Sequence, residues 1–298
     1  MLHTPVLLSE ILALGGEAHR IVDGTLGDGG HAAAFIAAGA QVLGIDRDPQ
    51  AIRRATERIG SSRLATVQGS SFDDSTLARV REFQPDLILL DLGVSSRQLD
   101  DDALGFSFRP GAVLDMRMSG AGRTAADILN QWPEEDLATV FADWGDERKA
   151  RPLAREVARR RSRVPMAVSD DLVNAIRSVL GPRSGPPDFA RIFQALRIAV
   201  NGELDGLAEA LPALRDALVP EGRLLVISYH SGEDRIVKHA FQEWAKRCIC
   251  PPELPVCRCR GQALGILDPR KPVRASETEV NANPRARSAT LRGFRTAR

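Results

Sequence analysis

The chain contains no hydrophobic run long enough to span a bilayer. Its longest apolar stretches, such as Leu87–Leu90 and Leu224–Ile227, have only the length of a strand. The opening residues, MLHTPVLLSE, lack both a basic start and a cleavable apolar segment. We therefore expect neither membrane insertion nor secretion, and we expect a cytoplasmic protein.

The chain also lacks net charge and has very little lysine. Its 298 residues carry a formal net charge of +1, which gives no global indication of nucleic-acid binding. Only four of the 40 basic residues are lysines, and the other 36 are arginines. We attribute this bias to the base composition of the genome. A single arginine is therefore weak evidence for function, and a cluster of arginines is stronger evidence.

The rest of the composition, 43% hydrophobic and 27% charged, is that of a globular protein. The first half alternates apolar segments, expected as strands, with segments expected as helices, which predicts a doubly wound α/β fold. Continuously apolar strands of this kind are typical of a parallel sheet that is covered on both faces. The expected strands are Arg20–Val22, Gln41–Ile45, Leu64–Gln68, Asp86–Asp91 and Arg223–Ser228. The expected helices of the first half are His31–Ala38, Pro49–Ile59 and Ser75–Phe83.

The alternation stops between residues 110 and 185, where only helix signals occur. A proline start and a glycine stop predict one helix over residues 133–145, and an acidic cap predicts another over residues 169–181. A single long helix is expected over Phe189–Leu218, before the last expected strand. We therefore expect a discontinuous domain of residues 1–110 and 188–298, with an inserted helical substrate-recognition domain of residues 111–187.

A glycine-rich loop, VDGTLGDGGHAAAFI (Val22–Ile36), follows the first expected strand. A phosphate-binding P-loop needs a lysine and then Ser or Thr after its last glycine. Here His31 and Ala32 follow Gly30, so a P-loop is excluded. The dinucleotide pattern G-x-G-x-x-G fits the glycine spacing only loosely.

The acidic residues of this loop favour a cofactor that carries a positive charge and no phosphate. Asp23 and Asp28 would oppose a pyrophosphate, whereas they suit the amino group of S-adenosylmethionine. Asp46 follows after about 20 residues, at a strand end where an acidic side chain can accept hydrogen bonds from both ribose hydroxyls. Taken alone, Asp46 could equally cap the helix that begins at Pro49. Together with the loop, it favours a binding site for S-adenosylmethionine.

Several longer stretches resemble one known family. They are DLGVSSRQLDD, which begins at Asp91, GFSF (Gly105–Phe108), LDMRM (Leu114–Met118), RIFQALRIAVNGEL (Arg191–Leu204), SYHSGEDRIVK (Ser228–Lys238) and NPRARSATLR (Asn283–Arg292). With HTPVLLSE and DGTLGDGGH, they make the chain resemble the bacterial 16S ribosomal RNA cytosine-N4-methyltransferases, the RsmH or MraW family. The resemblance covers nearly the full length, and its motifs are long and specific.

The resemblance implies a fold, a reaction and a set of site residues. The fold is a class I S-adenosylmethionine-dependent methyltransferase, a Rossmann-like doubly wound sheet with an inserted all-helical domain. The reaction methylates the exocyclic N4 amine of a cytidine in the decoding region of 16S ribosomal RNA, within the small ribosomal subunit or its precursor. No membrane or DNA partner is expected. Carried over by position, the cofactor contacts are Gly29, Gly30, His31, Asp46, Phe72, Asp91 and Gln98.

Asp91 is also the catalytic candidate, because related amine methyltransferases take hydrogen-bond acceptors from the motif that ends the fourth strand. Its carboxylate could accept from the target amine, contact the methionine end of the donor, or only cap the loop. The chain departs from the family pattern Ser-Phe-His-Ser-Leu-Glu-Asp-Arg at Tyr229 and Gly232. Tyrosine keeps the aromatic ring, whereas Gly232 removes a side chain and would loosen the loop.

Two arginine clusters and one histidine are candidates for RNA contact. Helical spacing in the stretch Arg148–Arg163 predicts either a phosphate-contacting surface or a solvated helix face. The segment Arg285–Arg298 invites the same two interpretations, and we expect RNA contact at both places, giving affinity without base selectivity. His230 follows the fifth strand on the ligand side of the sheet, although a lone histidine is more often structural. The expected RNA contacts are Arg155, Arg159, Arg160, His230, Arg285 and Arg287.

All four cysteines lie within 12 residues, in the pattern C-x-C-x6-C-x-C. In a cytosolic protein such a cluster favours a metal or redox site over structural disulfides. Structural zinc usually prefers C-x2-C, however, and C-x-C makes a tighter chelate. We therefore assign no metal from the sequence, and metal binding stays an alternative. The cluster is Cys248, Cys250, Cys257 and Cys259.

Two other classes of protein compete with the methyltransferase. A nicotinamide-dependent dehydrogenase shares the doubly wound fold, but the acidic loop disfavours its cofactor. A non-catalytic RNA-binding or small-subunit assembly factor on the same fold is the second alternative. The presence of Asp91, Gln98 and the glycine loop argues against it.

Overall fold

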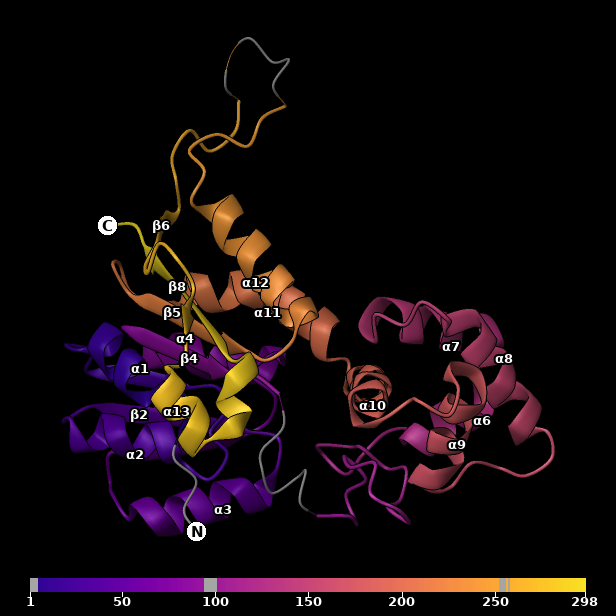
Figure 1. The fold of residues 1–298 in the computed structure, drawn as a ribbon. Coiled ribbons are helices and arrows are strands. Elements are labelled where there is room, and N and C mark those ends of the chain that lie inside the picture. Colours follow the sequence, from indigo (N-terminus) through magenta and orange to yellow (C-terminus); the bar gives the residue numbers. More distant parts are fainter. Residues whose placement is uncertain (1–4, 94–100, 252–255, 257) are drawn as a thin grey trace. The chain divides into compact units, whose positions relative to one another are not determined.

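The computed structural model describes residues 5–93, 101–251, 256 and 258–298. The chain forms two compact units, one of Met1–Gly93 with Leu204–Arg298 and the other of Val94–Glu203 (Figure 1). The boundaries expected from the sequence, after residue 110 and before residue 188, both fall inside the second unit. Phe106 and Ile192 lie outside the expected inserted domain and yet pack into the core of the second unit.

The first unit alternates strands and helices as expected, and one further group of elements follows at its carboxyl-terminal end. Its first half consists of α1 (Leu8–Gly15), β1 (Arg20–Asp23), α2 (Gly30–Ala37), β2 (Gln41–Asp46), α3 (Pro49–Ile59), β3 (Leu64–Gln68), α4 (Asp74–Phe83) and β4 (Leu87–Asp91). Its second half consists of α11 (Glu203–Ala217), β5 (Arg223–Ser228), α12 (Ser231–Trp244), β6 (Gly265–Leu267), β7 (Val273–Arg274), α13 (Glu277–Ala282), the 3-10 helix η2 (Pro284–Ser288) and β8 (Thr290–Thr296).

The strands form one eight-stranded sheet in the order β3-β2-β1-β4-β5-β8-β6, with β7 pairing beside β8. Strands β1 to β5 are parallel, and β8 runs antiparallel to β5, β6 and β7. The chain moves outward from β1 to β3 and then returns to place β4 on the other side of β1. This reversal lies between β1 and β4, where open α/β sheets bind ligands beyond the carboxyl ends of their strands.

Both faces of the sheet are covered, because successive residues of each central strand point to opposite faces. In β4, Ile88 and Leu90 pack with α4, α11 and α12, whereas Leu87 and Leu89 pack with α1, α2 and α3. The result is a three-layer sandwich, and the continuously apolar strands follow from it.

The second unit is all-helical around its own core. It consists of α6 (Ala125–Gln131), α7 (Glu134–Thr139), the π-helix η1 (Val140–Trp144), α8 (Ala150–Arg161), α9 (Ser169–Leu180) and α10 (Pro186–Asn201). Phe141, Leu153, Ile176 and Leu196 are among the buried residues that hold these helices together. In the part of the chain that the structure describes, no helix is long and apolar enough to cross a membrane.

The expected single helix over Phe189–Leu218 is wrong, because the segment forms two helices that are separated at Gly202. This residue has a φ of 59° and caps α10, and α11 begins at the next residue. A glycine inside a helical pattern is tolerated at a cost of about 1 kcal/mol, so the pattern alone does not show the break.

Candidate functional site

The carboxyl ends of β1, β2 and β4 each finish on an aspartate, namely Asp23, Asp46 and Asp91. Parallel pairing puts these residues on one edge of the sheet, on both sides of the reversal between β1 and β4. The end of β5 lies beside Asp91, because Asp91 pairs with Ile227. The sheet therefore gathers acidic side chains where this class of fold places its ligands.

The glycine loop joins this edge to α2, and the packing requires glycine at both predicted positions. Gly29 has a φ of 74°, and a Cβ there would lie 2.9 Å from Cδ1 of Ile59 and 3.0 Å from Cβ of Ala55. At Gly30, a Cβ would lie 2.6 Å from Cγ of Pro5. The loop backbone therefore packs closely against α3 and Pro5, and this packing excludes any larger residue at positions 29 and 30.

Asp46 holds the glycine loop in place. Its Oδ2 accepts from the backbone N–H of Gly27 at 2.8 Å, and its Oδ1 accepts from that of Asp48 at 2.8 Å. Burial raises the pKa of Asp46, and these two backbone donors oppose the rise. The alternative that Asp46 caps the next helix is wrong, because Asp48 caps α3 through Gln50.

The two acidic residues of the glycine loop differ in their surroundings. Asp28 is exposed, and its carboxylate forms an ion pair with Arg54 at 2.8 Å. Asp23 is buried, and its one hydrogen-bond donor in the described residues is the backbone N–H of Thr25, at 3.3 Å. Burial raises the pKa of Asp23 from 3.8 to about 6, and the nearby His31 opposes the rise. Of the pair, Asp23 is therefore the carboxylate that a cation would stabilise most.

Asp91 is held by a tyrosine from the neighbouring strand end. The hydroxyl of Tyr229 donates to Oδ1 of Asp91 at 2.7 Å, and the backbone N–H of Asp91 donates to the hydroxyl of Thr25 at 2.6 Å. Burial raises the pKa of Asp91, while His31 and the tyrosine hydroxyl oppose the rise. Burial also raises the pKa of Tyr229 far above its usual range, so this hydroxyl stays protonated and donates.

His31 faces the other oxygen of Asp91. Its Nε2 lies 3.0 Å from the carbonyl oxygen of Val6, which can only accept, so Nε2 carries the hydrogen. In the neutral ring Nδ1 then has a lone pair, and it lies 3.8 Å from Oδ2 of Asp91. This separation is longer than a hydrogen bond, so the two atoms do not share a proton.

The segment after β5 is ordered by Glu233 at the start of α12. Oε2 of Glu233 accepts from the backbone N–H of Tyr229 at 2.8 Å, and Oε1 lies 3.1 Å from Nε2 of His230. Nδ1 of His230 accepts from the backbone N–H of Glu233 at 3.4 Å, which makes His230 the N-cap of α12. Gly232 lies within this first helical turn, and a Cβ there would lie 3.2 Å from the His230 ring.

Two predicted cofactor contacts give less information. Phe72 follows β3 and packs against α11, where a Cβ on Gly206 would lie 2.9 Å from its ring. The guanidinium of Arg47 lies 5.7 Å from the Phe72 ring centroid. Gln98 lies outside the described residues.

The predicted arginine helix is α8, and three of its guanidinium groups interact with neighbouring glutamates. Arg159 and Arg160 both donate to Glu156 at 2.7 Å, and Arg155 lies 3.6 Å from Glu134. The hydrogen bonds from Arg159 and Arg160 lower the pKa of Glu156 to about 2. The local net charge of this helix face is therefore smaller than its sequence indicates.

The carboxyl-terminal arginines divide into two groups. Arg292, Arg295 and Arg298 form ion pairs with Asp234, Asp268 and Glu221, which ties them to other parts of the first unit. Arg285 and Arg287, the two predicted RNA contacts, lie in η2, where Arg287 is exposed and Arg285 is half-buried. Contact of these two residues with RNA stays a prediction.

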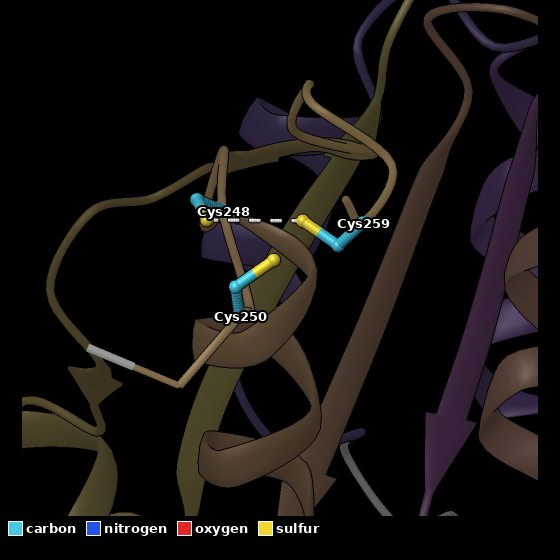
Figure 2. Close-up of side chains that lie close together, drawn as sticks. All are labelled: Cys248, Cys250 and Cys259. Atoms are coloured by element: carbon cyan, nitrogen blue, oxygen red, sulfur yellow. Dashed lines mark hydrogen bonds between the residues drawn. The ribbon is translucent and has the colours of Figure 1, made fainter. Parts of the chain in front are cut away.

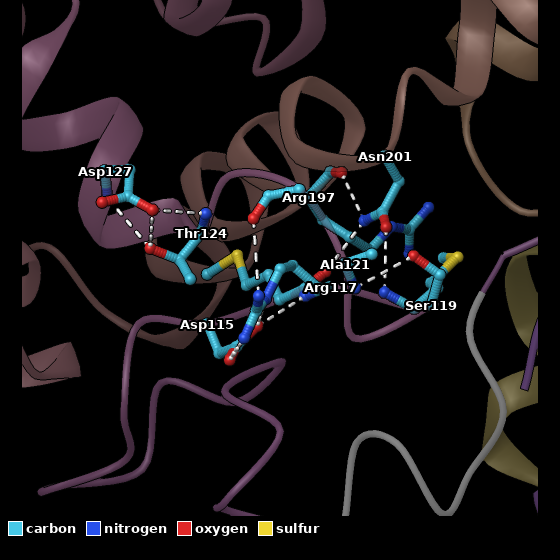
Figure 3. A network of polar contacts seen from close by, with 11 residues as sticks. Asp115, Arg117, Ser119, Ala121, Thr124, Asp127, Arg197 and Asn201 are labelled. Carbon is cyan, nitrogen blue, oxygen red and sulfur yellow. Dashed lines mark hydrogen bonds and ion pairs between the residues drawn. The ribbon is translucent and has the colours of Figure 1, made fainter.

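Two of the family motifs meet within the helical unit. Asn201, from the motif at the end of α10, accepts from the backbone N–H of Met118 at 3.0 Å and donates to the carbonyl oxygen of Met116 at 2.9 Å. Arg117 donates twice to Asp115 at 2.8 Å in the same network (Figure 3). Asn201 therefore fixes the backbone of the LDMRM loop against α10, and the Asp115–Arg117 pair lies within the loop.

Sequence reasoning gave no role at this edge to Thr25 and Glu233, and treated Tyr229 only as a departure from a family pattern. The position of two of them in the sequence could have indicated the site, because Thr25 is the second residue after β1 and Tyr229 is the first residue after β5. Residues just beyond parallel strands that pair with each other lie at the same edge of the sheet.

The strand order, the antiparallel β8 beside β5 and the acidic carboxyl edge define a class I S-adenosylmethionine-dependent methyltransferase. A model of the MraW methylase family matches residues 1–297. The chain belongs to the MraW methylase family.

Two relatives agree with this assignment over nearly their full length. The ribosomal RNA small subunit methyltransferase H of Gemmatimonas aurantiaca is 53% identical over 302 residues, which cover 99% of this chain and 95% of that protein. The protein of the same name from Rubrobacter xylanophilus is 46% identical, over 99% of this chain and 96% of the relative. Among solved structures, a putative rRNA methylase from Clostridium thermocellum gives a TM-score of 0.43 at 10% identity, covering 99% of this chain and 100% of the other.

Proposed function

We propose that this protein methylates the exocyclic N4 amine of a cytidine in the decoding region of 16S ribosomal RNA, within the small ribosomal subunit or its precursor in the cytoplasm. The observation that supports this most directly is the placement of Asp23, Asp46 and Asp91 at the carboxyl ends of β1, β2 and β4, beside the glycine loop. The names of the relatives, which act on small-subunit ribosomal RNA, support the choice of substrate.

The residues at this edge fit S-adenosylmethionine, which supplies an electrophilic methyl group on a positively charged sulfur. Asp23 is buried with a raised pKa, so a positive charge beside it would stabilise its ionised form. Asp46 keeps acceptor capacity beyond its two backbone donors, because a carboxylate has about four lone-pair positions. Gly29, Gly30 and Phe72 would complete the contacts, with Gln98 as a further candidate.

The substrate amine is a poor nucleophile, because its lone pair is delocalised into the cytosine ring. Acceptors that bind the amine hydrogens push the nitrogen towards a tetrahedral geometry and so increase its nucleophilicity. We assign this role to Asp91, whose Oδ1 is oriented by the hydroxyl of Tyr229. Oδ2 lies 3.8 Å from Nδ1 of His31, and the Asp91 carboxylate can take up the proton that the amine releases.

We further propose that the helical unit contributes RNA contacts through Arg155, Arg159 and Arg160, and that His230, Arg285 and Arg287 contribute contacts from the first unit. Each arginine on an RNA-facing surface would bind phosphate and release counterions. Such contacts position the RNA without reading its bases.

The replacement Asp91→Asn tests the catalytic assignment. It preserves size but replaces one acceptor oxygen with a donor, so the single-turnover rate on small-subunit particles should fall by about 10²-fold or more. Asp28→Asn is the matched control, because Asp28 lies in the neighbouring loop and is exposed and paired with Arg54. A normal rate with weaker S-adenosylmethionine binding would limit Asp91 to cofactor binding, and normal values of both would refute the assignment.

The substrate is tested by mass spectrometry of 16S ribosomal RNA from cells with and without the protein. We expect one N4-methylated cytidine in the decoding region to disappear with the gene and to return with the wild type but not with Asp91→Asn. Loss of small-subunit assembly with unchanged methylation would instead support a non-catalytic assembly factor.

A further inference from the structure

The three described cysteines of the cluster converge at the base of one loop. Cys248, Cys250 and Cys259 lie between α12 and β6, and their sulfur atoms are all within 4.8 Å of one another (Figure 2). Cys257, the fourth cysteine of the pattern, lies outside the described residues. We propose that Cys248, Cys250 and Cys259 bind a structural zinc ion.

The sulfur geometry fits a tetrahedral zinc site better than a disulfide. Sγ of Cys259 and Sγ of Cys248 are 3.8 Å apart. Zinc–sulfur bonds of about 2.3 Å at tetrahedral angles place two sulfur ligands about 3.8 Å apart. A disulfide requires a sulfur–sulfur distance of about 2.05 Å and joins only two sulfurs. It therefore does not explain why the third sulfur lies beside the other two.

Backbone hydrogen bonds to the sulfurs support the same conclusion. The N–H of Ile249 donates to Sγ of Cys259, and the N–H of Arg258 donates to Sγ of Cys250, both at 3.3 Å. Each bond crosses from one C-x-C segment to the other and orients a sulfur towards the centre of the cluster. Hydrogen bonds of this kind to metal ligands fix their orientation and tune their binding.

The loop has no hydrophobic core of its own in the described residues. Between Trp244 and Gly265 these residues form no helix or strand, and from Lys246 to Leu264 none of them is buried. A long loop without a core usually needs a metal or a covalent bridge to stay ordered. Arg260 anchors the loop by donating to the carbonyl oxygens of Glu243 and Lys246.

The choice of metal follows from the ligands and their charge. Thiolates are soft ligands that select zinc, Cu(I) or iron–sulfur clusters over magnesium or calcium. Three thiolates around Zn²⁺ carry a net charge of −1, and Lys246, Arg247 and Arg258 supply positive charge in the same segment. Zinc needs no redox partner, and the three thiolates leave its fourth tetrahedral position to one further ligand.

Metal analysis of the purified full-length protein tests the proposal. We expect about one zinc ion per chain by inductively coupled plasma and native mass spectrometry. Cys248→Ser, Cys250→Ser and Cys259→Ser should each weaken zinc binding at least tenfold, since even the loss of an outer partner costs about 10- to 100-fold. Ile249→Ser is the matched control, because it keeps every thiol and the backbone donor and should retain zinc.

A second measurement separates metal loss from misfolding. Cobalt(II) added to the metal-free protein should give the charge-transfer and d–d bands of a tetrahedral thiolate site, and the cysteine variants should lose these bands. Circular dichroism and S-adenosylmethionine binding should be unchanged, because the loop lies outside the sheet. A wild-type protein without metal whose cysteines are fully reactive, or joined in disulfides, would overturn the proposal.

Discussion

The replacement Tyr229→Phe tests how Asp91 is kept ready to accept a hydrogen bond. It removes one oxygen, the hydroxyl that donates to Oδ1 of Asp91 at 2.7 Å, and it leaves the aromatic ring in place. The family pattern quoted above has Phe at this position, so the variant should fold. Its effect should therefore be confined to the carboxylate.

The expected size follows from this one hydrogen bond. A hydrogen bond to a charged group contributes about 1.5–3 kcal/mol. The Tyr229 hydroxyl stabilises the ionised carboxylate more than the neutral acid, so its loss raises the pKa of Asp91 further. Because Asp91 must be ionised to accept with both oxygens, the acid limb of the rate should move to higher pH, by at most about two pH units at 1.36 kcal/mol per unit.

The assay is the single-turnover methylation rate of small-subunit particles as a function of pH. The variant should lose rate at low pH and approach the wild-type rate above the shifted limb. Tyr229 is the only tyrosine of the chain, so ¹³C-labelled tyrosine gives one ring signal, which should titrate with Asp91 and stop doing so in Asp91→Asn. An acid limb at the same pH in both proteins would refute the reasoning.

Three other replacements test neighbouring features. The ionised form of Asp23, with a pKa of about 6 instead of 3.8, opposes folding, so denaturant unfolding should show the wild type losing up to about 3 kcal/mol relative to Asp23→Asn between pH 4 and pH 7. Parallel pH dependences would contradict this. Asp46→Ala should weaken S-adenosylmethionine binding by about 1.5–3 kcal/mol in calorimetry, and unchanged affinity in a folded variant would remove Asp46 from the site. Arg159→Gln with Arg160→Gln should reduce the salt slope of RNA binding by up to about one unit per lost phosphate contact, whereas Glu156→Gln should steepen it; equal slopes in all three proteins would assign this helix face to solvent.

The parallel half of the fold could be predicted from the sequence because its central strands bury both faces, although β3 at the end of the sheet is mostly exposed. The bounds of β3, β5 and α3 agree with the expected ranges, and β4 begins one residue later than expected. The antiparallel part was not predicted. The sequence indicates only a basic segment where β8 lies, because nothing in a single sequence shows that Arg292 and Arg295 have ion-pair partners 58 and 27 residues earlier, at Asp234 and Asp268.

The site could be predicted only in outline. Periodicity and strand ends placed Asp46 and Asp91 at one edge, and the glycines followed from the loop. The contact between Asp91 and Tyr229 could not be foreseen, because it depends on the register of β4 against β5, which are separated by the whole helical unit. The sequence also could not show which of Asp23 and Asp28 suits a cationic cofactor, because both are acidic loop residues. The structure separates them, since Asp23 is buried and Asp28 is exposed.

The position of β8 in the sheet has a consequence for the order of synthesis. β8 is the last described strand to leave the ribosome, yet it lies between β5 and β6 and also pairs with β7. Until it emerges, β5 has an open edge and both short strands lack their partner. The nascent chain must therefore keep one side of β5 unpaired until residues 290–296 have emerged, and an unpaired strand edge is prone to aggregation.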